Sequence, residues 1–167
     1  LTSRRPVLTH ARSARFRQQK ETAVRNLFFD AVLREILGYT TFDPDGPYTL
    51  AFERPIRRGA VDVALGRFGA LDGAEEIVAP FELKGPATAD LDAVPDGRGR
   101  SPVQQAWDYA IDAPGSRWVL VSNCLEIRLY RFGRGRETYE KFDLARLDEP
   151  EQLQRLRDGV ELNDGIT

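Results

Sequence analysis

The chain has almost none of the residues that carry sulfur or histidine chemistry. It contains one cysteine, Cys124, one histidine, His10, and no methionine. A single cysteine excludes an internal disulfide and a cysteine-ligated zinc site, and we expect Cys124 to be a small buried hydrophobic residue in a strand. One histidine in a polar stretch supplies neither a Ser-His-Asp relay nor a multi-histidine metal site. A bound metal ion would therefore need oxygen ligands, which Mg²⁺, Mn²⁺ and Ca²⁺ prefer.

Long apolar runs are also missing. No segment approaches the roughly 18 consecutive apolar residues that a membrane span needs, and no apolar signal core follows the arginine-rich N-terminus. The 167 residues, 41% of them hydrophobic, suffice for one core. We expect a basic arm over residues 1–18 and a single cytoplasmic domain over residues 19–167. Because the sequence has no methionine, we also expect it to be part of a larger polypeptide.

Positive charge is concentrated near the N-terminus. Residues 1–25 hold seven basic residues and one acid, a net charge of +6, whereas the whole chain carries −2. A basic arm on an acidic body suits a polyanion, because each arginine laid on a phosphate releases counterions. The alternative is a solvated tail without a partner. Charge alone favours this alternative.

Apolar periodicity predicts a helix followed by a group of strands. Helical spacing of apolar residues predicts a helix over residues 19–37, which Gly38 ends. Short apolar runs bounded by Gly, Pro and Asp then predict three strands joined by short turns, over residues 49–55, 59–68 and 77–84. A three-stranded meander is therefore expected after the first helix.

A long connection separates this meander from the remaining elements. Residues 85–101 show little periodicity and are too long for an ordinary connection, which predicts a mobile loop. Ser101, followed by a proline, predicts the start of a helix over residues 102–111. The last predicted elements are strands over residues 117–122 and 126–132, separated by a turn at Asn123, and a surface helix over residues 148–158.

Three charged side chains interrupt the apolar pattern of the meander. Alternation along a strand points Asp62 away from an apolar set formed by Val61, Val63 and Leu65. On the third strand, Glu82 and Lys84 share one face and lie about 7 Å apart by strand rise. The opposite face of that strand holds Ile77, Ala79, Phe81 and Leu83. Two acids and one lysine can therefore meet across neighbouring strands.

These side chains suit the hydrolysis of a phosphodiester bond. Cleavage of a DNA backbone needs an activated water and neutralised phosphoryl oxygens, and a carboxylate-held divalent metal assists both. Asp62 and Glu82 are the candidate metal ligands, and Lys84 would orient the water and offset negative charge. The alternative is an exposed ion pair between Glu82 and Lys84. Arginine outnumbers lysine 21 to 3, so a lysine at this strand end favours a functional role.

The order of these residues resembles the PD-(D/E)XK nuclease superfamily. Its motif is an acid on one strand and Glu/Asp-x-Lys on the next, which here reads Asp62 and then Glu82-Leu83-Lys84. Pro80 departs from a regular motif strand, because its missing N–H predicts a bulge or a sheet edge. The departure concerns where the strand starts and leaves the motif intact.

A second motif of the superfamily lies in the predicted helix after the long loop. Gln105 and Tyr109 match the Gln-x-x-x-Tyr motif of RecB-like members, and one helical turn separates them, so they share a face. The resemblance implies that both act near the scissile phosphate, and we count them with the catalytic residues. The alternative is an amphipathic helix in which Tyr109 is simply half buried.

The resemblance also implies a metal ion and its ligands. Such nucleases often carry a glutamate on the first helix, and Glu21 lies on the apolar stripe of the helix predicted here. The alternative for Glu21 is an interaction with the helix dipole, and Glu35 is a weaker candidate. The implied ion is Mg²⁺, with Mn²⁺ as a possible substitute. Its implied ligands are Asp62, Glu82, the carbonyl of Leu83, and Glu21.

Within the superfamily, the run from Glu82 to Gln105 looks most like the N-terminal cleavage module of large restriction-modification polypeptides. This implies a restriction-endonuclease-like core, a mixed central sheet flanked by helices in the order αβββαβ. It implies an Mg²⁺-dependent endonuclease that cuts double-stranded DNA, leaves 5′-phosphate and 3′-hydroxyl ends, and has methyltransferase and target-recognition domains elsewhere in its polypeptide.

Two other classes of protein remain as alternatives. The first is a catalytically silent module that keeps the nuclease fold and binds DNA or a protein partner. The second is a structural interaction domain, which would leave the basic arm and the Glu-x-Lys pattern unexplained. Four loop arginines fit any of these classes, since they can contact phosphates or simply keep the loops soluble: Arg57, Arg58, Arg98 and Arg100.

Overall fold

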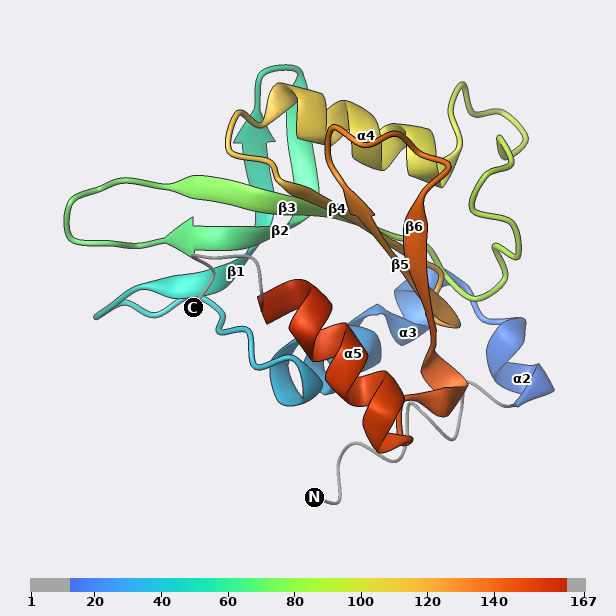
Figure 1. Ribbon diagram of the computed structural model, residues 1–167. Helices are drawn as coiled ribbons and strands as arrows, with labels where there is room; N and C mark the ends of the chain where they lie inside the picture. The colour runs from blue at the N-terminus through green and yellow to red at the C-terminus, as the bar shows by residue number, and fades with distance from the viewer. Residues whose placement is uncertain (1–12, 162–167) are drawn as a thin grey trace.

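A six-stranded mixed sheet, flanked by helices, forms the centre of this α/β protein in the computed structural model, which describes residues 13–161 (Figure 1). The strands are β1 (Tyr48–Ile56), β2 (Gly59–Phe68), β3 (Glu76–Leu83), β4 (Trp118–Ser122), β5 (Glu126–Arg131) and β6 (Tyr139–Asp143). They lie side by side in sequence order. All neighbours are antiparallel except β3 and β4, which are parallel.

The meander β1–β2–β3 is confirmed, and so are β4 and β5. Parallel strands need a crossover connection, and α4 (Pro102–Asp112) lies between β3 and β4 in the chain. Its predicted cap is also confirmed, because Ser101 accepts a hydrogen bond from the backbone N–H of Gln104 while the Gln104 side chain accepts one from Ser101. The sequence prediction missed β6.

The motif strand β3 lies inside the sheet, between β2 and β4. The prediction that Pro80 marks a sheet edge is therefore wrong, and a register irregularity lies next to Pro80 rather than at it. The β2–β3 register shifts between Leu65 and Gly66, close to the pairing of Ala64 with Pro80. Gly66 permits this irregularity, because a β-carbon there would lie 1.9 Å from the carbonyl oxygen of Glu76.

The predicted first helix is present, but its winding changes halfway. It begins as α3 (Glu21–Phe28) and continues as a π-helix, η1 (Phe29–Ile36). Gly38 follows with a φ of 78°, which suits a helix end and favours glycine. Arg157 on α5 (Pro150–Glu161) donates two hydrogen bonds to the Ile36 carbonyl, so the C-terminal helix holds the end of η1.

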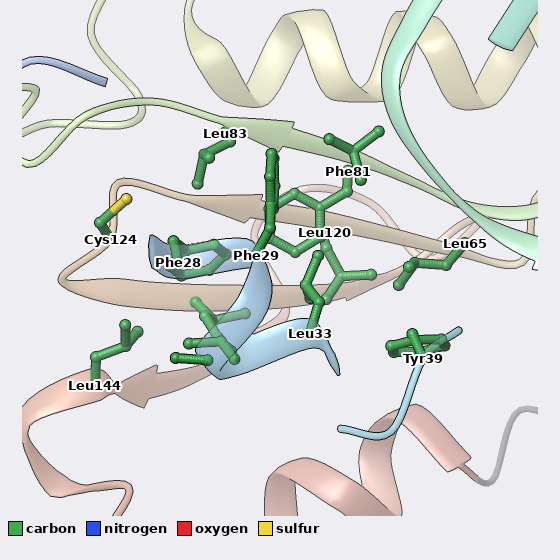
Figure 2. Packing of buried hydrophobic residues seen from close by; sticks show 14 of the residues in the cluster. Phe28, Phe29, Leu33, Tyr39, Leu65, Phe81, Leu83, Leu120, Cys124 and Leu144 are labelled. Carbon is green, nitrogen blue, oxygen red and sulfur yellow. The ribbon is translucent and has the colours of Figure 1, made fainter. Parts of the chain in front are cut away.

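The main core lies between the sheet and these helices, which pack on the face opposite α4 (Figure 1). Phe28 of α3 packs against Phe81 of β3 with ring centroids 6.0 Å apart. Figure 2 shows these rings beside Leu83, Leu120 and other buried apolar side chains of the same cluster. Because one face of β3 is buried in this core, the alternate side chains of β3 point to the other face, towards α4.

Two residues depart from the predicted alternation. Val63, Leu65, Ala79, Phe81 and Leu83 belong to the main core as expected, but Val61 and Ile77 pack in a separate cluster with Ala64 and Phe68. The register shift between Leu65 and Gly66 reverses which side of the sheet the following side chains point to. This explains why Ile77, which pairs with Gly66, lies outside the main core. Val61 lies near the end of the β1–β2 hairpin, where the strands bend towards α4 (Figure 1).

The connection over residues 85–101 contains no helix or strand, as predicted, and parts of it are anchored to the domain. Leu91 is fully buried and its carbonyl accepts a hydrogen bond from Val103. Asp92 forms an ion pair of 2.7 Å with the buried Arg128 of β5. Residues 92–102 therefore form a loop whose two ends lie together, held by the protein beneath it.

Part of the expected basic arm is folded against the domain. Residues 14–17 form a short helix, α2 (Ala14–Arg17), which Ser13 caps, and the buried Phe16 joins the main core. The rest of the arm and His10 lie outside the described residues. Across residues 13–161, no helix has the length and apolar character needed to cross a membrane. The surface helix predicted near the C-terminus is α5.

Candidate active site

The strand register brings the two motif acids together. Val63 of β2 pairs with Phe81 of β3, and Ala64 pairs with Pro80. Continuing this antiparallel register by one residue places Asp62 opposite Glu82. Side chains that are directly opposite on neighbouring strands have β-carbons about 5 Å apart. The two carboxylates therefore lie on the same side of the sheet, the side that α4 covers.

Glu82 is fully buried, which is unusual for a carboxylate. Its Oε2 has no hydrogen-bond partner among the described residues, and its Oε1 contacts only the ammonium of Lys84. Burial raises the pKa of Glu82 from its ordinary value of 4.5 to about 7. The charge of Lys84 acts in the opposite direction, and the nearby charges of Asp62 and Glu21 raise the pKa further.

Lys84 supplies the one positive charge that contacts Glu82 among the described residues. Its Nζ lies 2.6 Å from Oε1 of Glu82, and a quarter of the lysine side chain stays exposed. One oxygen of Glu82 thus faces an ammonium and the other has no partner. A cation would satisfy this second oxygen, because a buried anionic oxygen without a partner is costly.

Gln105 and Tyr109 lie on the face of α4 that approaches these charges. The Gln105 amide donates a hydrogen bond of 2.5 Å to the Tyr109 hydroxyl. Burial raises the pKa of Tyr109, and the charges of Glu82 and Asp62 raise it further. The tyrosine is also half buried against the cluster of Ala64 and Phe68, so packing and proximity to the acids are both present.

Glu21 is the first residue of α3 and adjoins the end of the motif strand. A β-carbon on Gly85 would lie 2.1 Å from the backbone nitrogen of Glu21, so these segments touch. The side chain of Glu21 forms an ion pair of 3.3 Å with Arg25. This position is compatible with both predictions for Glu21, a ligand at the metal site and an acid that interacts with the helix dipole. Glu35 is exposed and lines a different cavity of about 720 Å³ with Asp30 and Arg34.

The four metal ligands that the resemblance implies do not all come together as one recognisable metal-binding cluster. Within residues 13–161, no three His, Cys, Asp or Glu side chains form a group that could hold a metal ion. Asp62 lies near enough to Glu82 for its charge to raise the pKa of Glu82, and the unpartnered oxygen of Glu82 fits a hard cation. The role of the Leu83 carbonyl and of Glu21 as ligands stays a prediction.

The turn between β4 and β5 fixes the backbone of Lys84, and sequence reasoning missed this. The Lys84 N–H donates to the carbonyl of Ser122 at 2.8 Å, and the Cys124 thiol donates to the carbonyl of Lys84 at 3.5 Å. Asn123 reaches the next segment by donating to the carbonyl of Thr88. Only the tertiary structure shows these contacts, because the turn lies nearly 40 residues after the motif.

Cys124 is buried as predicted, but it lies in this turn and not in a strand. Its φ of 64° is unusual for a residue with a side chain. Burial raises the pKa of the thiol to about 12, and the charge of Glu21 adds to the effect. A thiol with this pKa stays protonated at neutral pH.

Two of the four loop arginines are tied to acids of α4. Arg58 forms a two-pronged ion pair with Asp112, its Nε 2.9 Å from Oδ2, and Arg100 lies 2.5 Å from Asp108. These contacts attach the β1–β2 hairpin and the long loop to α4. Arg57 and Arg98 are exposed.

Comparison of the chain with protein-family models, curated proteins and solved structures finds no match.

Proposed function

We propose that this chain is an Mg²⁺-dependent endonuclease domain that hydrolyses phosphodiester bonds of double-stranded DNA, with a restriction-endonuclease-like core of the PD-(D/E)XK type. The observation that carries the proposal is the buried Glu82, which contacts Lys84 at 2.6 Å and has the charge of Asp62, on the neighbouring strand β2, close enough to raise its pKa. An ordinary structural ion pair has no need of a second carboxylate beside it, because like charges repel.

The residues divide into three roles. Asp62 and Glu82 would hold Mg²⁺ or Mn²⁺, which supplies an activated water and charge neutralisation when bound. Lys84 holds its ammonium beside Glu82, where it can orient the water and offset negative charge on the phosphate. Gln105 and Tyr109 place an amide and a hydroxyl on the helix above, within reach of the same charges.

The direct test is cleavage of supercoiled plasmid DNA in Mg²⁺. We expect the parent chain to nick or linearise the plasmid, and Glu82→Ala and Lys84→Ala to lose this activity by orders of magnitude. Glu151→Ala and Lys141→Ala are matched controls that remove the same charges from exposed positions on α5 and β6. Circular dichroism checks that all four variants fold. Full cutting by Glu82→Ala and Lys84→Ala would exclude the assigned site.

A catalytically silent module that binds DNA or a protein partner is the second candidate. The observation that favours it is that no cluster of three acidic, histidine or cysteine ligands occurs within residues 13–161. Filter binding of a labelled duplex separates the two functions. If the chain is a silent module, we expect the parent to bind the duplex on the filter but to leave plasmid uncut in both Mg²⁺ and Mn²⁺.

A further inference from the structure

We infer that the junction of α2 and α3, with Arg15, Arg17 and Lys20, is the surface along which the backbone of duplex DNA approaches the Glu82 site. The inference rests on the proposed function for the identity of the substrate, and it assigns the contacts that hold this substrate. The three side chains are exposed. Residues 13–20 carry three positive charges and no acid, and Glu21 follows as the first residue of α3.

These cations differ from most others on the domain. Many basic side chains of the sheet are paired with carboxylates, as in the contacts of Arg54 with Glu75 and of Arg58 with Asp112, whereas exposed arginines such as Arg131, Arg134 and Arg136 form no ion pair with a described residue. Arg15, Arg17 and Lys20 form no ion pair with any described residue. Unpaired cations remain available to phosphate, and the neighbouring acid in the sequence, Glu21, forms its ion pair with Arg25.

The junction borders the candidate site directly. The backbone N–H of Ala87 donates to the carbonyl of Gln19 at 3.2 Å. A β-carbon on Gly85 would lie 2.7 Å from the carbonyl carbon of Lys20. The chain that leaves Lys84 therefore runs along the junction. Figure 1 shows α2 and the loop after β3 on the same side of the molecule.

The cations stand on a folded segment. Phe16, between Arg15 and Arg17, is buried in the main core, and Ser13 caps α2 by accepting a hydrogen bond from the N–H of Phe16. Because the backbone of the junction is already ordered, less conformational entropy is lost when a phosphate binds. A free tail of the same composition would lose more.

Duplex DNA fits this surface better than a single strand. Proteins that bind single strands present exposed aromatic rings on which bases stack. The exposed large aromatic residues of the described chain are Phe42, Phe52 and Tyr139, which lie before β1, on β1 and on β6. None lies in residues 13–25 or 85–104. Cations without a stacking platform are suited to a phosphate backbone.

The test compares two triple variants that remove the same charge. Arg15→Gln/Arg17→Gln/Lys20→Gln changes the junction, and Arg131→Gln/Arg134→Gln/Arg136→Gln changes three exposed arginines near the β5–β6 turn. Affinity for a fluorescent 30-base-pair duplex of arbitrary sequence is measured by anisotropy at several salt concentrations. EDTA is present throughout, so neither cleavage nor a metal ion contributes to the signal.

For the junction variant we expect a loss of at least about tenfold in affinity at 0.1 M salt. Each lost phosphate contact lowers the salt slope by about 0.9, so the slope should fall by roughly 2 to 3. The β5–β6 variant should retain most of the parent's slope. An unchanged slope in the junction variant, an equal loss in the control, or a parent affinity that does not depend on salt overturns the inference.

Further arms separate this surface from other polyanion sites and from the proposed catalysis. A 30-nucleotide single strand should bind more weakly than the duplex. Vesicles with anionic lipid should not compete with the duplex for binding. The reverse result in either experiment overturns the inference. If the parent never cuts plasmid but the junction variant shows the expected slope, the nuclease proposal fails and the surface stands. If the parent cuts and the slope is unchanged, the surface fails alone.

Discussion

The backbone of Gly85 lies against the backbone of Glu21, and a β-carbon on residue 85 would come within 2.1 Å of the Glu21 nitrogen. This contact joins the end of the Glu82-Leu83-Lys84 motif to the first turn of α3. It places the charge of Glu21 close enough to raise the pKa of Glu82. The missing side chain of one glycine thus determines how near the first helix comes to the candidate site.

Gly85→Ala is expected to destabilise the protein by about 1 to 3 kcal/mol, because the new methyl group must displace backbone atoms. Urea denaturation measures the change. Gly99→Ala is the matched control, since a β-carbon there meets no atom within 4 Å, and its stability should match or exceed that of the parent. Equal stability of the two variants would show that the segments move apart at little cost.

The pKa of Glu82 predicts how stability depends on pH in the metal-free protein. The folded state holds its proton up to about pH 7, whereas the unfolded chain releases it near 4.5. Between these values the folded state binds more protons, so stability falls as pH rises through this window. The full difference corresponds to about 3 kcal/mol, as an order of magnitude.

Glu82→Gln removes this titration while keeping the size of the side chain. In EDTA, we expect the stability of the variant relative to the parent to increase between pH 4.5 and 7 and to stay constant above that. Denaturant titrations of both proteins at several pH values measure the difference. A constant difference from pH 4.5 to 8 would mean that Glu82 titrates normally and that water reaches it.

Metal binding should release a proton from the same carboxyl group. At pH 6 most Glu82 is protonated, and a cation bound there displaces the proton, so close to one proton should leave per ion. At pH 8.5 few should leave. Calorimetry with Mn²⁺ in two buffers of different ionisation enthalpy measures the number. Binding heats in Glu82→Gln equal to those of the parent would place the ion elsewhere.

The sequence allowed the core of the candidate site to be predicted, because strand geometry is regular. Short turns fix an antiparallel register, and alternation then determines which side chains share a face. The facing of Asp62 and Glu82 follows from these two rules. The proximity of Lys84 to Glu82 required no further information, since Lys84 lies two residues after Glu82, directly after the end of β3.

The features that the sequence did not reveal depend on contacts between distant segments or on weak patterns. β6 has a single buried side chain, Phe142, so no alternation identifies it. The π-winding of η1 leaves a pattern of apolar residues that an ordinary helix also explains. The anchoring of Lys84 by Ser122 and Cys124 requires the β4–β5 turn to lie beside β3, which only the folded chain determines.

The anchored loop predicts unequal losses of stability for the two partners of one ion pair, Arg128 and Asp92. Arg128 is 8% exposed and also contacts the buried carboxylate of Glu126, 12% exposed, at 3.1 Å. Arg128→Leu should cost about 3 to 5 kcal/mol, because it leaves Glu126 without its buried partner. Asp92→Asn should cost less than about 1 kcal/mol, since 62% of the Asp92 side chain is exposed and solvent screens its charge.

Urea denaturation of both variants measures these values, and limited proteolysis between residues 92 and 102 should be faster in Arg128→Leu. Equal and small losses in both would mean that the Asp92–Arg128 ion pair does not hold the loop.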